Sequence, residues 1–535
     1  MEARRPESRI WWKHGVIYHI YPLSFMDSNG DGIGDIQGII SKMNYLSDLG
    51  IDAIWLSPVF SSPMVDFGYD VSDYRKIDPV FGTLEDFKEL ISKAHAQGIR
   101  VICDMILNHT SDQHPWFMES RSSKYNLKRN WYIWKDGHLG APPNNWRSAT
   151  GGSAWEFDDQ TGQYYFHSFF KEQPDLNWRD PHLPEVFFEE VKFWLEFGVD
   201  GFRLDVINMI AKDKRFRNNP LLFGIPFFQR HRFTRNRPKS YKIVKELRKL
   251  VDQYDNRAMI GEIYTLPPGD SSMAASYLAG GKGIHMTFDF SLLFRSWSAK
   301  KYYSCIHNWY AHIPETGWPC NVLSNHDMFR SIDRFPWRLY KDEKAKVAAT
   351  LLLTLRGTPF VYYGEEIGMR NGKVKYTEIK DPLGKKWWPL FQGRDKARTP
   401  MQWNDNIHGG FTSGKPWLPV NNEAAFRNVE NQERNESSLL HHYRQLIHLR
   451  KTHPALHEGR WVPLINGDKG ILAYSRIHED ERIIIILNFT ARQKRVLLPE
   501  HSAGRVIFST HRDAGKSFYF QYMQILPFEA SIFKA

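Results

Sequence analysis

Short apolar segments, rich in β-branched and aromatic residues, recur along the first two thirds of the chain. They lie at 16–22, 51–58, 100–107, 199–206, 258–264, 284–290, 320–327 and 358–366. Most are apolar over much of their length instead of alternating with polar residues, which is typical of strands buried on both faces of a parallel sheet. The pattern therefore predicts eight parallel strands.

The stretches between these segments show the spacing of amphipathic helices. Apolar residues recur every three or four positions over 84–98, after the second segment, and over 185–198, before the fourth. Both stretches end at a glycine, Gly98 and Gly198, as helices often do. Eight alternating units predict an α/β fold, a closed (β/α)8 barrel. An open doubly wound sheet is the alternative, but no Gly-x-Gly-x-x-Gly motif follows the first strand.

Two parts of the chain fall outside this alternation. Residues 108–174 hold no clean strand–helix unit and are dense in Trp, Asn, Gly and Pro, which is too much chain for an ordinary loop. We expect them to form an inserted domain after the third strand that shapes the mouth of the barrel. Residues 460–535, after a predicted helix at 437–456, contain short strands separated by turn residues and predict a C-terminal antiparallel β-sandwich domain. Residues 1–107 and 175–459 are then assigned to the barrel.

Composition narrows the class of protein. Hydrophobic residues make up 42% and charged residues 24%, a composition that buries a large core. The three cysteines, Cys103, Cys305 and Cys320, are too few for a disulfide framework, and either a reducing compartment or plain core packing explains them. No apolar run reaches the roughly 18 residues of a membrane span, and the N-terminus lacks the apolar core of a signal peptide. We therefore predict a cytoplasmic protein with no membrane partner.

The net charge of +11 raises the question of a nucleic-acid partner. Lys and Arg are spread along the chain, with only modest clusters at 212–217 and 230–239. A nucleic-acid interface usually concentrates them on one face or one helix. The spread favours solvated surface, so no nucleic-acid partner is expected. The choice between a monomer and a small homo-oligomer stays open.

Charged side chains stand where several predicted strands end. In a (β/α)8 barrel the C-terminal ends of the strands meet at one face, which carries the active site. A buried carboxylate is costly without partners, and a single one is often only a loop or helix cap. Capping does not explain four strands that all end in carboxylates. The residues concerned are Asp104, Asp205, Glu262 and Asp327, with Arg203, His109 and His326 beside them.

Glycoside hydrolysis is the reaction that suits this set. It uses one carboxylate to attack the anomeric carbon and another to protonate the leaving oxygen, through an oxocarbenium-like transition state. An arginine beside the attacking carboxylate keeps that group ionised. The chain shows no serine nucleophile elbow, phosphate-binding loop or zinc pattern that would favour another chemistry. No organic cofactor is therefore expected, and the partner is a small oligosaccharide substrate.

Four motifs carry a resemblance to a known family. DMILNHTS (104–111), GFRLDVIN (201–208), GEIY (261–264) and LSNHD (323–327) resemble, in this order, the four signature regions of the α-amylase family of glycoside hydrolases. QPDLNW (173–178) is similar to a fifth region found in the oligo-1,6-glucosidase and α-glucosidase subgroup. The resemblance extends over nearly the whole chain. It implies a TIM barrel with an inserted domain and a C-terminal β domain.

The resemblance also implies the catalytic roles. Asp205 matches the family's nucleophile, Glu262 its general acid/base, and Asp327 the aspartate that stabilises the transition state. Asp104 more naturally organises its strand end than touches the reacting bond. The reaction implied is double displacement with retention of configuration, and a sugar hydroxyl in place of water would give transglycosylation.

A further set of residues matches the subsite for the first glucose. The arginine beside the nucleophile and two histidines contact that sugar in the family, and three more residues close the pocket around a non-reducing end. The matching residues are Arg203, His109 and His326, and then Asp66, Tyr69 and Arg398.

The segment DSNGDGIGD (27–35) is a separate signal, for a structural Ca²⁺ ion. Its spacing is that of a calcium loop, but position 12 is Gly38 and a strand precedes it, so an EF-hand is excluded. It looks like the metal loop after the first barrel strand of oligo-1,6-glucosidases. An Asx-rich turn without metal is the alternative. The ligands implied are Asp27, Asn29, Asp31, the carbonyl of Ile33, and Asp35.

Val206, directly after the predicted nucleophile, bears on the linkage. In the family that this chain resembles, valine at this position is typical of enzymes acting on α-1,6-linked glucosides, whereas Ala or Thr is more usual in α-1,4-specific maltases. One such side chain contributes only about 1–3 kcal/mol of discrimination, and a β-branched residue also simply suits a strand. We expect an exo-acting α-glucosidase preferring isomalto-oligosaccharides; the alternatives are a maltase-type α-glucosidase and a trehalose-6-phosphate hydrolase. A non-catalytic scaffold is disfavoured because the carboxylate set is complete.

Overall fold

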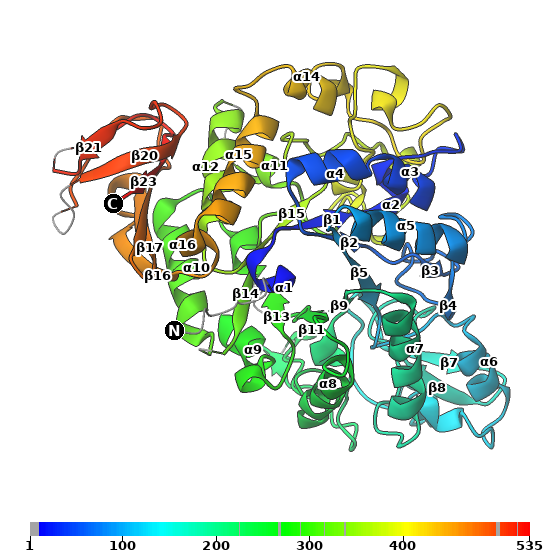
Figure 1. Ribbon diagram of the computed structural model, residues 1–535. Coiled ribbons are helices and arrows are strands. Elements are labelled where there is room, and N and C mark those ends of the chain that lie inside the picture. Colours follow the sequence, from blue (N-terminus) through cyan, green and yellow to red (C-terminus); the bar gives the residue numbers. More distant parts are fainter. Residues whose placement is uncertain are drawn as a thin grey trace, which may run out of the picture.

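The computed structural model describes residues 10–535, except 224, 266–268, 289, 315, 336–338, 499–502 and 522. Eight strands close into a barrel with helices around it (Figure 1). Around the barrel their order is β1-β15-β14-β13-β12-β9-β5-β2, and every neighbouring pair is parallel. Each strand overlaps one of the predicted apolar segments, so the (β/α)8 barrel is confirmed. The strands are β1 (Ile17–Ile20), β2 (Ala53–Leu56), β5 (Arg100–Met105), β9 (Gly201–Leu204), β12 (Ala258–Gly261), β13 (Met286–Phe288), β14 (Trp318–Val322) and β15 (Thr358–Tyr362).

All eight barrel strands end earlier than the predicted segments do. β9 ends at Leu204 and β12 at Gly261, so Asp205 and Glu262 are the first residues beyond them. Val206 has a φ of 36°, which no strand residue adopts and which is strained for a β-branched side chain. The chain therefore leaves the barrel wall at the point where its polar residues begin.

Amphipathic helices cover the outside of the barrel. α5 (Leu84–Ala96) begins with a capping box between Thr83 and Asp86, and α7 (Leu183–Phe197) ends at Gly198, whose φ of 113° suits glycine. Both predicted helices are thereby confirmed. The helix predicted at 437–456 is α15 (Leu439–Thr452) followed by the short α16 (Pro454–His457). Three more barrel helices are α8 (Pro238–Val251), α10 (Ala299–His312) and α12 (Lys341–Thr354).

The segment between β5 and α7 forms a small sheet of its own, at the lower right of Figure 1. It holds helix α6 (Pro115–Ser122) and a three-stranded antiparallel sheet in the order β6-β8-β7. Trp146, Trp155 and Phe166 pack together in its core. The strands are β6 (Trp134–Lys135), β7 (Trp155–Asp158) and β8 (Gln163–Phe166).

The C-terminal part is an antiparallel β structure beside the barrel (Figure 1). Six strands pair in the order β16-β17-β18-β23-β20-β21, and a two-stranded ribbon, β19-β22, contributes Val496 and Ile525 to the same hydrophobic cluster as Ile484 and Phe533. Among the described residues, no helix has the length and hydropathy needed to cross a membrane. The strands are β16 (Arg460–Asn466), β17 (Ile471–His478), β18 (Glu481–Asn488), β19 (Lys494–Val496), β20 (Ala503–Ser509), β21 (Ser517–Tyr519), β22 (Met523–Ile525) and β23 (Ala530–Lys534).

Candidate active site

A pocket of about 340 Å³ lies at the C-terminal ends of the barrel strands. Six of the residues predicted from the sequence line this pocket, and three more, Arg203, His326 and Arg398, are buried behind its lining. The structure thus brings all nine predicted catalytic and substrate-binding residues to one place. Those that line the pocket are Asp66, Tyr69, His109, Asp205, Glu262 and Asp327.

Arg203 holds three carboxylates together. Its Nη1 donates to Asp104 Oδ1 at 2.8 Å and to Asp205 Oδ1 at 2.7 Å, and its Nη2 donates to Glu262 Oε2. Burial opposes the charge of the guanidinium, but Asp104 and Glu262 raise the pKa of Arg203 well above its usual value. The arginine therefore stays cationic and fixes the two pocket carboxylates, Asp205 and Glu262, from behind.

Glu262 and Asp205 differ in how readily they hold a proton. Burial raises the pKa of Glu262 to about 8, and the negative charges of Asp205 and Asp327 contribute. Burial also raises the pKa of Asp205, to about 6, while Arg203 and a hydrogen bond with Glu262 oppose the rise. Near pH 7 the pair therefore carries its proton mainly on Glu262. One neutral acid beside one carboxylate is the arrangement that acid-assisted displacement requires.

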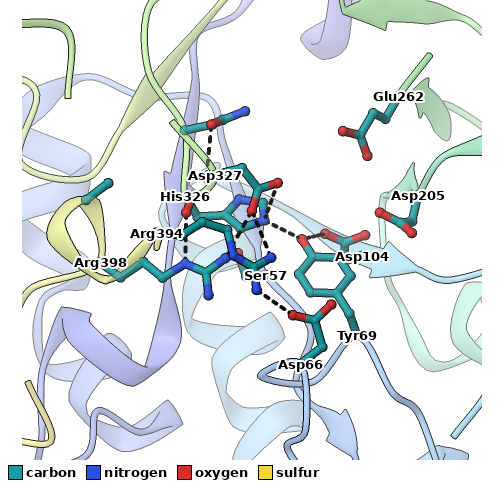
Figure 2. Close-up of polar contacts among 12 residues, drawn as sticks. Ser57, Asp66, Tyr69, Asp104, Asp205, Glu262, His326, Asp327, Arg394 and Arg398 are labelled. Carbon is teal, nitrogen blue, oxygen red and sulfur yellow. Dashed lines mark hydrogen bonds and ion pairs between the residues drawn. The ribbon is translucent and has the colours of Figure 1, made fainter. Parts of the chain in front are cut away.

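Asp327 faces this pair across the pocket, as Figure 2 shows. Its Oδ1 lies 3.0 Å from Arg398 Nη2 and 3.4 Å from Arg394 Nη1, and its Oδ2 lies 3.4 Å from His326 Nε2. Burial alone would raise the pKa of Asp327, but His326 and the two arginines outweigh it and lower the pKa below its usual value. Asp327 is therefore expected to be ionised near neutral pH.

Tyr69 and two neutral histidines connect these groups. The Tyr69 hydroxyl donates to Asp104 Oδ2 at 3.0 Å and lies 2.9 Å from His326 Nε2, and the two rings stack. His109 Nε2 lies 3.0 Å from the Tyr69 carbonyl and 3.2 Å from Gln173 Nε2. Burial lowers the pKa of His326 to about 3 and also lowers that of His109. Both imidazoles therefore act as hydrogen-bonding groups and not as cations.

Arg394, which no sequence motif singles out, closes the inner end of the pocket. Its Nη2 lies 2.7 Å from Asp66 Oδ1 and 2.9 Å from Asp381 Oδ1. Arg398 lies behind the lining, where its Nε donates to the His326 carbonyl at 2.8 Å. Both arginines come from the loop after β15 and both contact Asp327, but Arg394 is the one that also lines the pocket.

The outer wall of the pocket is apolar. The 108–174 segment contributes part of it, and loops after β12, β13 and β15 contribute the rest. Flat apolar rings of this kind suit the C–H faces of sugar rings and exclude water from the reacting bond. No periodic pattern in the sequence marks them. Val206 lines the pocket as well, and the other members of this wall include Phe169, Phe170, Tyr264, Phe290, Phe294 and Phe391.

The loop at 27–35 is held by its own side chains. Asp27 accepts from the N–H groups of Gly30 at 2.7 Å and Gly32 at 2.8 Å, and Asp35 caps α3 (Ile36–Ser41) through the N–H of Gly38. Its oxygen donors match calcium in chemistry. Among the described residues, however, the three Asp carboxylates of the loop are not within 4.8 Å of one another. The loop is thus shaped by Asx turns, and calcium remains a proposal.

The fold and this pocket together define a glycoside hydrolase. The family described as "Alpha amylase, catalytic domain" matches residues 19–459. The chain belongs to this α-amylase family. It is 42% identical to a probable alpha-glucosidase of Rhizobium meliloti, over 92% of this chain and 91% of that protein. It is 39% identical to an oligo-1,6-glucosidase of Parageobacillus thermoglucosidasius, over 98% and 99%. The crystal structure of XgtA, an alpha-glucosyl transfer enzyme, superposes with a TM-score of 0.92 at 38% identity, over 99% of this chain and 100% of that one.

Proposed function

We propose that this protein is a retaining, exo-acting α-glucosidase that releases α-glucose from the non-reducing end of isomalto-oligosaccharides. The observation that carries the proposal is the pair of Asp205 and Glu262 on one arginine, with ionised Asp327 opposite. The ion pair of Arg394 with Asp66 blocks the inner end, which suits one terminal glucose and not a chain passing through. Val206 in the lining favours the α-1,6 linkage.

The proposed reaction runs in two displacements. Asp205 attacks the anomeric carbon and forms a glucosyl ester, the glycosidic C–O bond breaks, and Glu262 gives its proton to the leaving oxygen. In the second step Glu262 takes a proton from water, whose oxygen attacks the same carbon and releases Asp205. Asp327 stabilises the positive charge that develops on the sugar in both steps. An acceptor hydroxyl in place of water would transfer the glucosyl group.

The two pKa values predict a bell-shaped pH profile. Activity requires Asp205 ionised and Glu262 protonated, so kcat/KM should fall as the pH drops through about 6 and as it rises through about 8. The two groups interact, so the limbs belong to the pair and not to one residue each. Initial rates on isomaltose between pH 4.5 and about 9.5 measure this profile. An optimum below about pH 5 would contradict the assignment of a protonated Glu262.

Isomaltose and maltose compared in parallel test the linkage. Proton NMR gives the initial rates and the first anomer released; we expect faster isomaltose cleavage, with α-glucose first. Val206→Thr, nearly equal in volume, should shift the isomaltose-to-maltose ratio of kcat/KM by about tenfold towards maltose. Faster maltose cleavage by the unaltered protein would refute the α-1,6 preference, and β-glucose as the first product would refute retention.

Trehalose 6-phosphate is the alternative substrate to be assayed beside them. Its phosphate needs cationic partners on the outer side of the pocket. Among the described lining residues, Arg394 is the one with a permanent positive charge, and Asp66, Asp381 and Asp327 already surround it. The apolar outer wall therefore favours an unphosphorylated sugar. Faster cleavage of the phosphorylated disaccharide would overturn this choice.

We also propose that the loop at 27–35 binds a structural Ca²⁺ ion, since Asp27, Asn29, Asp31 and the Ile33 carbonyl provide oxygen donors. Chelation should lower the Tm by on the order of 2–5 °C, and Ca²⁺ but not Mg²⁺ should restore it. Asp31 Oδ1 accepts from the N–H of Ile33 at 2.8 Å. Asp31→Asn keeps this acceptor but removes the negative charge. This variant should fold normally with a weakened response to Ca²⁺. A Tm indifferent to chelation in the unaltered protein would show that the loop is only a turn.

A further inference from the structure

A cluster of histidines around one glutamate lies far from the pocket in the fold. Among the described residues, one group of three His, Cys, Asp or Glu side chains has its ligand atoms all within 4.8 Å of one another: His14, His457 and Glu458. His14 Nε2 lies 3.0 Å and His457 Nδ1 lies 3.9 Å from the same oxygen, Glu458 Oε1. His478 Nε2 lies 3.8 Å from the other oxygen, Oε2. Two imidazoles thus converge on one carboxylate oxygen, with a third at the other oxygen.

The spacing is close to that of a tetrahedral zinc site. Zn–N and Zn–O bonds of about 2.0–2.2 Å place neighbouring ligand atoms about 3.4 Å apart. The observed separations of 3.0 and 3.9 Å lie on either side of that value. Two or three imidazoles with one carboxylate form a ligand set that suits Zn²⁺, whereas Ca²⁺ and Mg²⁺ prefer oxygen ligands alone. The side chains are 9%, 16% and 27% exposed for His14, His457 and Glu458, so an ion can enter from solvent.

The ligands come from three parts of the chain. His14 ends α1 (Trp11–His14), just before the first barrel strand, His457 ends α16, and His478 ends β17 of the C-terminal sheet. His14, His457 and Glu458 therefore join the segment before β1 to the end of α16, and His478 alone belongs to the C-terminal β structure. Because β1 starts after His14, the cluster lies towards the N-terminal ends of the strands, away from the pocket at their C-terminal ends. That face of a barrel serves stability and not catalysis.

We propose that His14, His457 and Glu458 bind a structural Zn²⁺ ion, with His478 or water as the fourth ligand, and that the ion fastens the segment before β1 to the end of α16. The zinc site is independent of the proposed glucosidase activity. Zn²⁺ should raise the Tm by stabilising the folded state, and leave kcat/KM unchanged.

Titration with ZnCl₂ under calorimetry tests the site, at constant Ca²⁺ so that the loop at 27–35 does not interfere. The unaltered protein should show one saturable site, and Co²⁺ should give the visible absorption of a tetrahedral ion. His457→Gln should weaken Zn²⁺ binding at least about tenfold and abolish the Tm shift. Glu458→Gln is the second variant, should the first fold poorly.

His453→Gln is the matched control. His453 Nδ1 lies 2.7 Å from Glu481 Oε1, so this change removes a histidine–carboxylate contact at the other end of α16 without touching the cluster. We expect its zinc affinity to equal that of the unaltered protein. Absence of saturable Zn²⁺ binding, or equal binding by His457→Gln, Glu458→Gln and the control, would refute the site.

Discussion

Replacing Asp205 by Asn is expected to lower kcat/KM on isomaltose by about 10⁴-fold or more. The side chain keeps its shape but loses the charge that attacks the anomeric carbon, and losing a nucleophile costs this order of magnitude in other hydrolases. The amide can still accept from Arg203 Nη1, now 2.7 Å from Asp205 Oδ1, so the fold should survive. Steady-state rates and a thermal melt of the same preparation measure the two effects.

Asp104→Asn is the matched control for this substitution. Asp104 contacts the same arginine at 2.8 Å but does not line the pocket, so its loss should cost only about 10- to 100-fold. A slow fluorinated glucosyl donor should also label the peptide that contains Asp205, which mass spectrometry detects. Labelling of another carboxylate, or equal losses in the two variants, would show that Asp205 is not the nucleophile.

Glu262→Gln should lower kcat/KM on isomaltose by about 10³-fold, because the leaving sugar then departs without a proton. The loss should shrink to about tenfold for a dinitrophenyl α-glucoside, whose leaving group needs no proton. The alkaline limb of the pH profile, near 8, should disappear with the acid that causes it. Rates on both substrates across the pH range measure these effects.

Glu365→Gln controls for the effect of changing a buried carboxyl group that lies outside the substrate pocket. Glu365 is also a buried carboxyl whose pKa burial raises, to about 7, but it accepts from Tyr443 at 3.1 Å and does not line the substrate pocket. Its substitution should leave both rates within about twofold. An equal loss on the two substrates in Glu262→Gln would mean that Glu262 does not act as the acid.

The barrel was predictable because strands buried on both faces leave continuous apolar runs in the sequence. The same logic located Asp205 and Glu262, since parallel strands of a barrel deliver their C-terminal ends to one face. Arg394 was not predictable in this way. It reaches Asp66 across most of the chain from a loop after β15, and no local pattern records such a contact. The apolar wall of the pocket was not predictable for the same reason, because residues such as Phe169 and Phe391 come from loops far apart in the sequence.

The strand ends were the part predicted least well. The predicted segments run on through Asp205, Val206 and Glu262 because the neighbouring residues are apolar. The left-handed backbone at Val206 ends the strand instead. Strain at a residue that lines a pocket is common at functional sites, where surrounding contacts hold it in place.

In the proposed mechanism, esterification of Asp205 would remove the negative charge that lies beside Glu262 on Arg203. That charge is one of the causes that raise the pKa of Glu262, so its loss would make Glu262 more acidic in the proposed covalent intermediate than in the free enzyme. Under the proposed mechanism the same side chain would donate a proton while the bond to the leaving sugar breaks and accept one when water attacks. The charge state of Asp205 would thus shift Glu262 from acid to base between the two proposed steps.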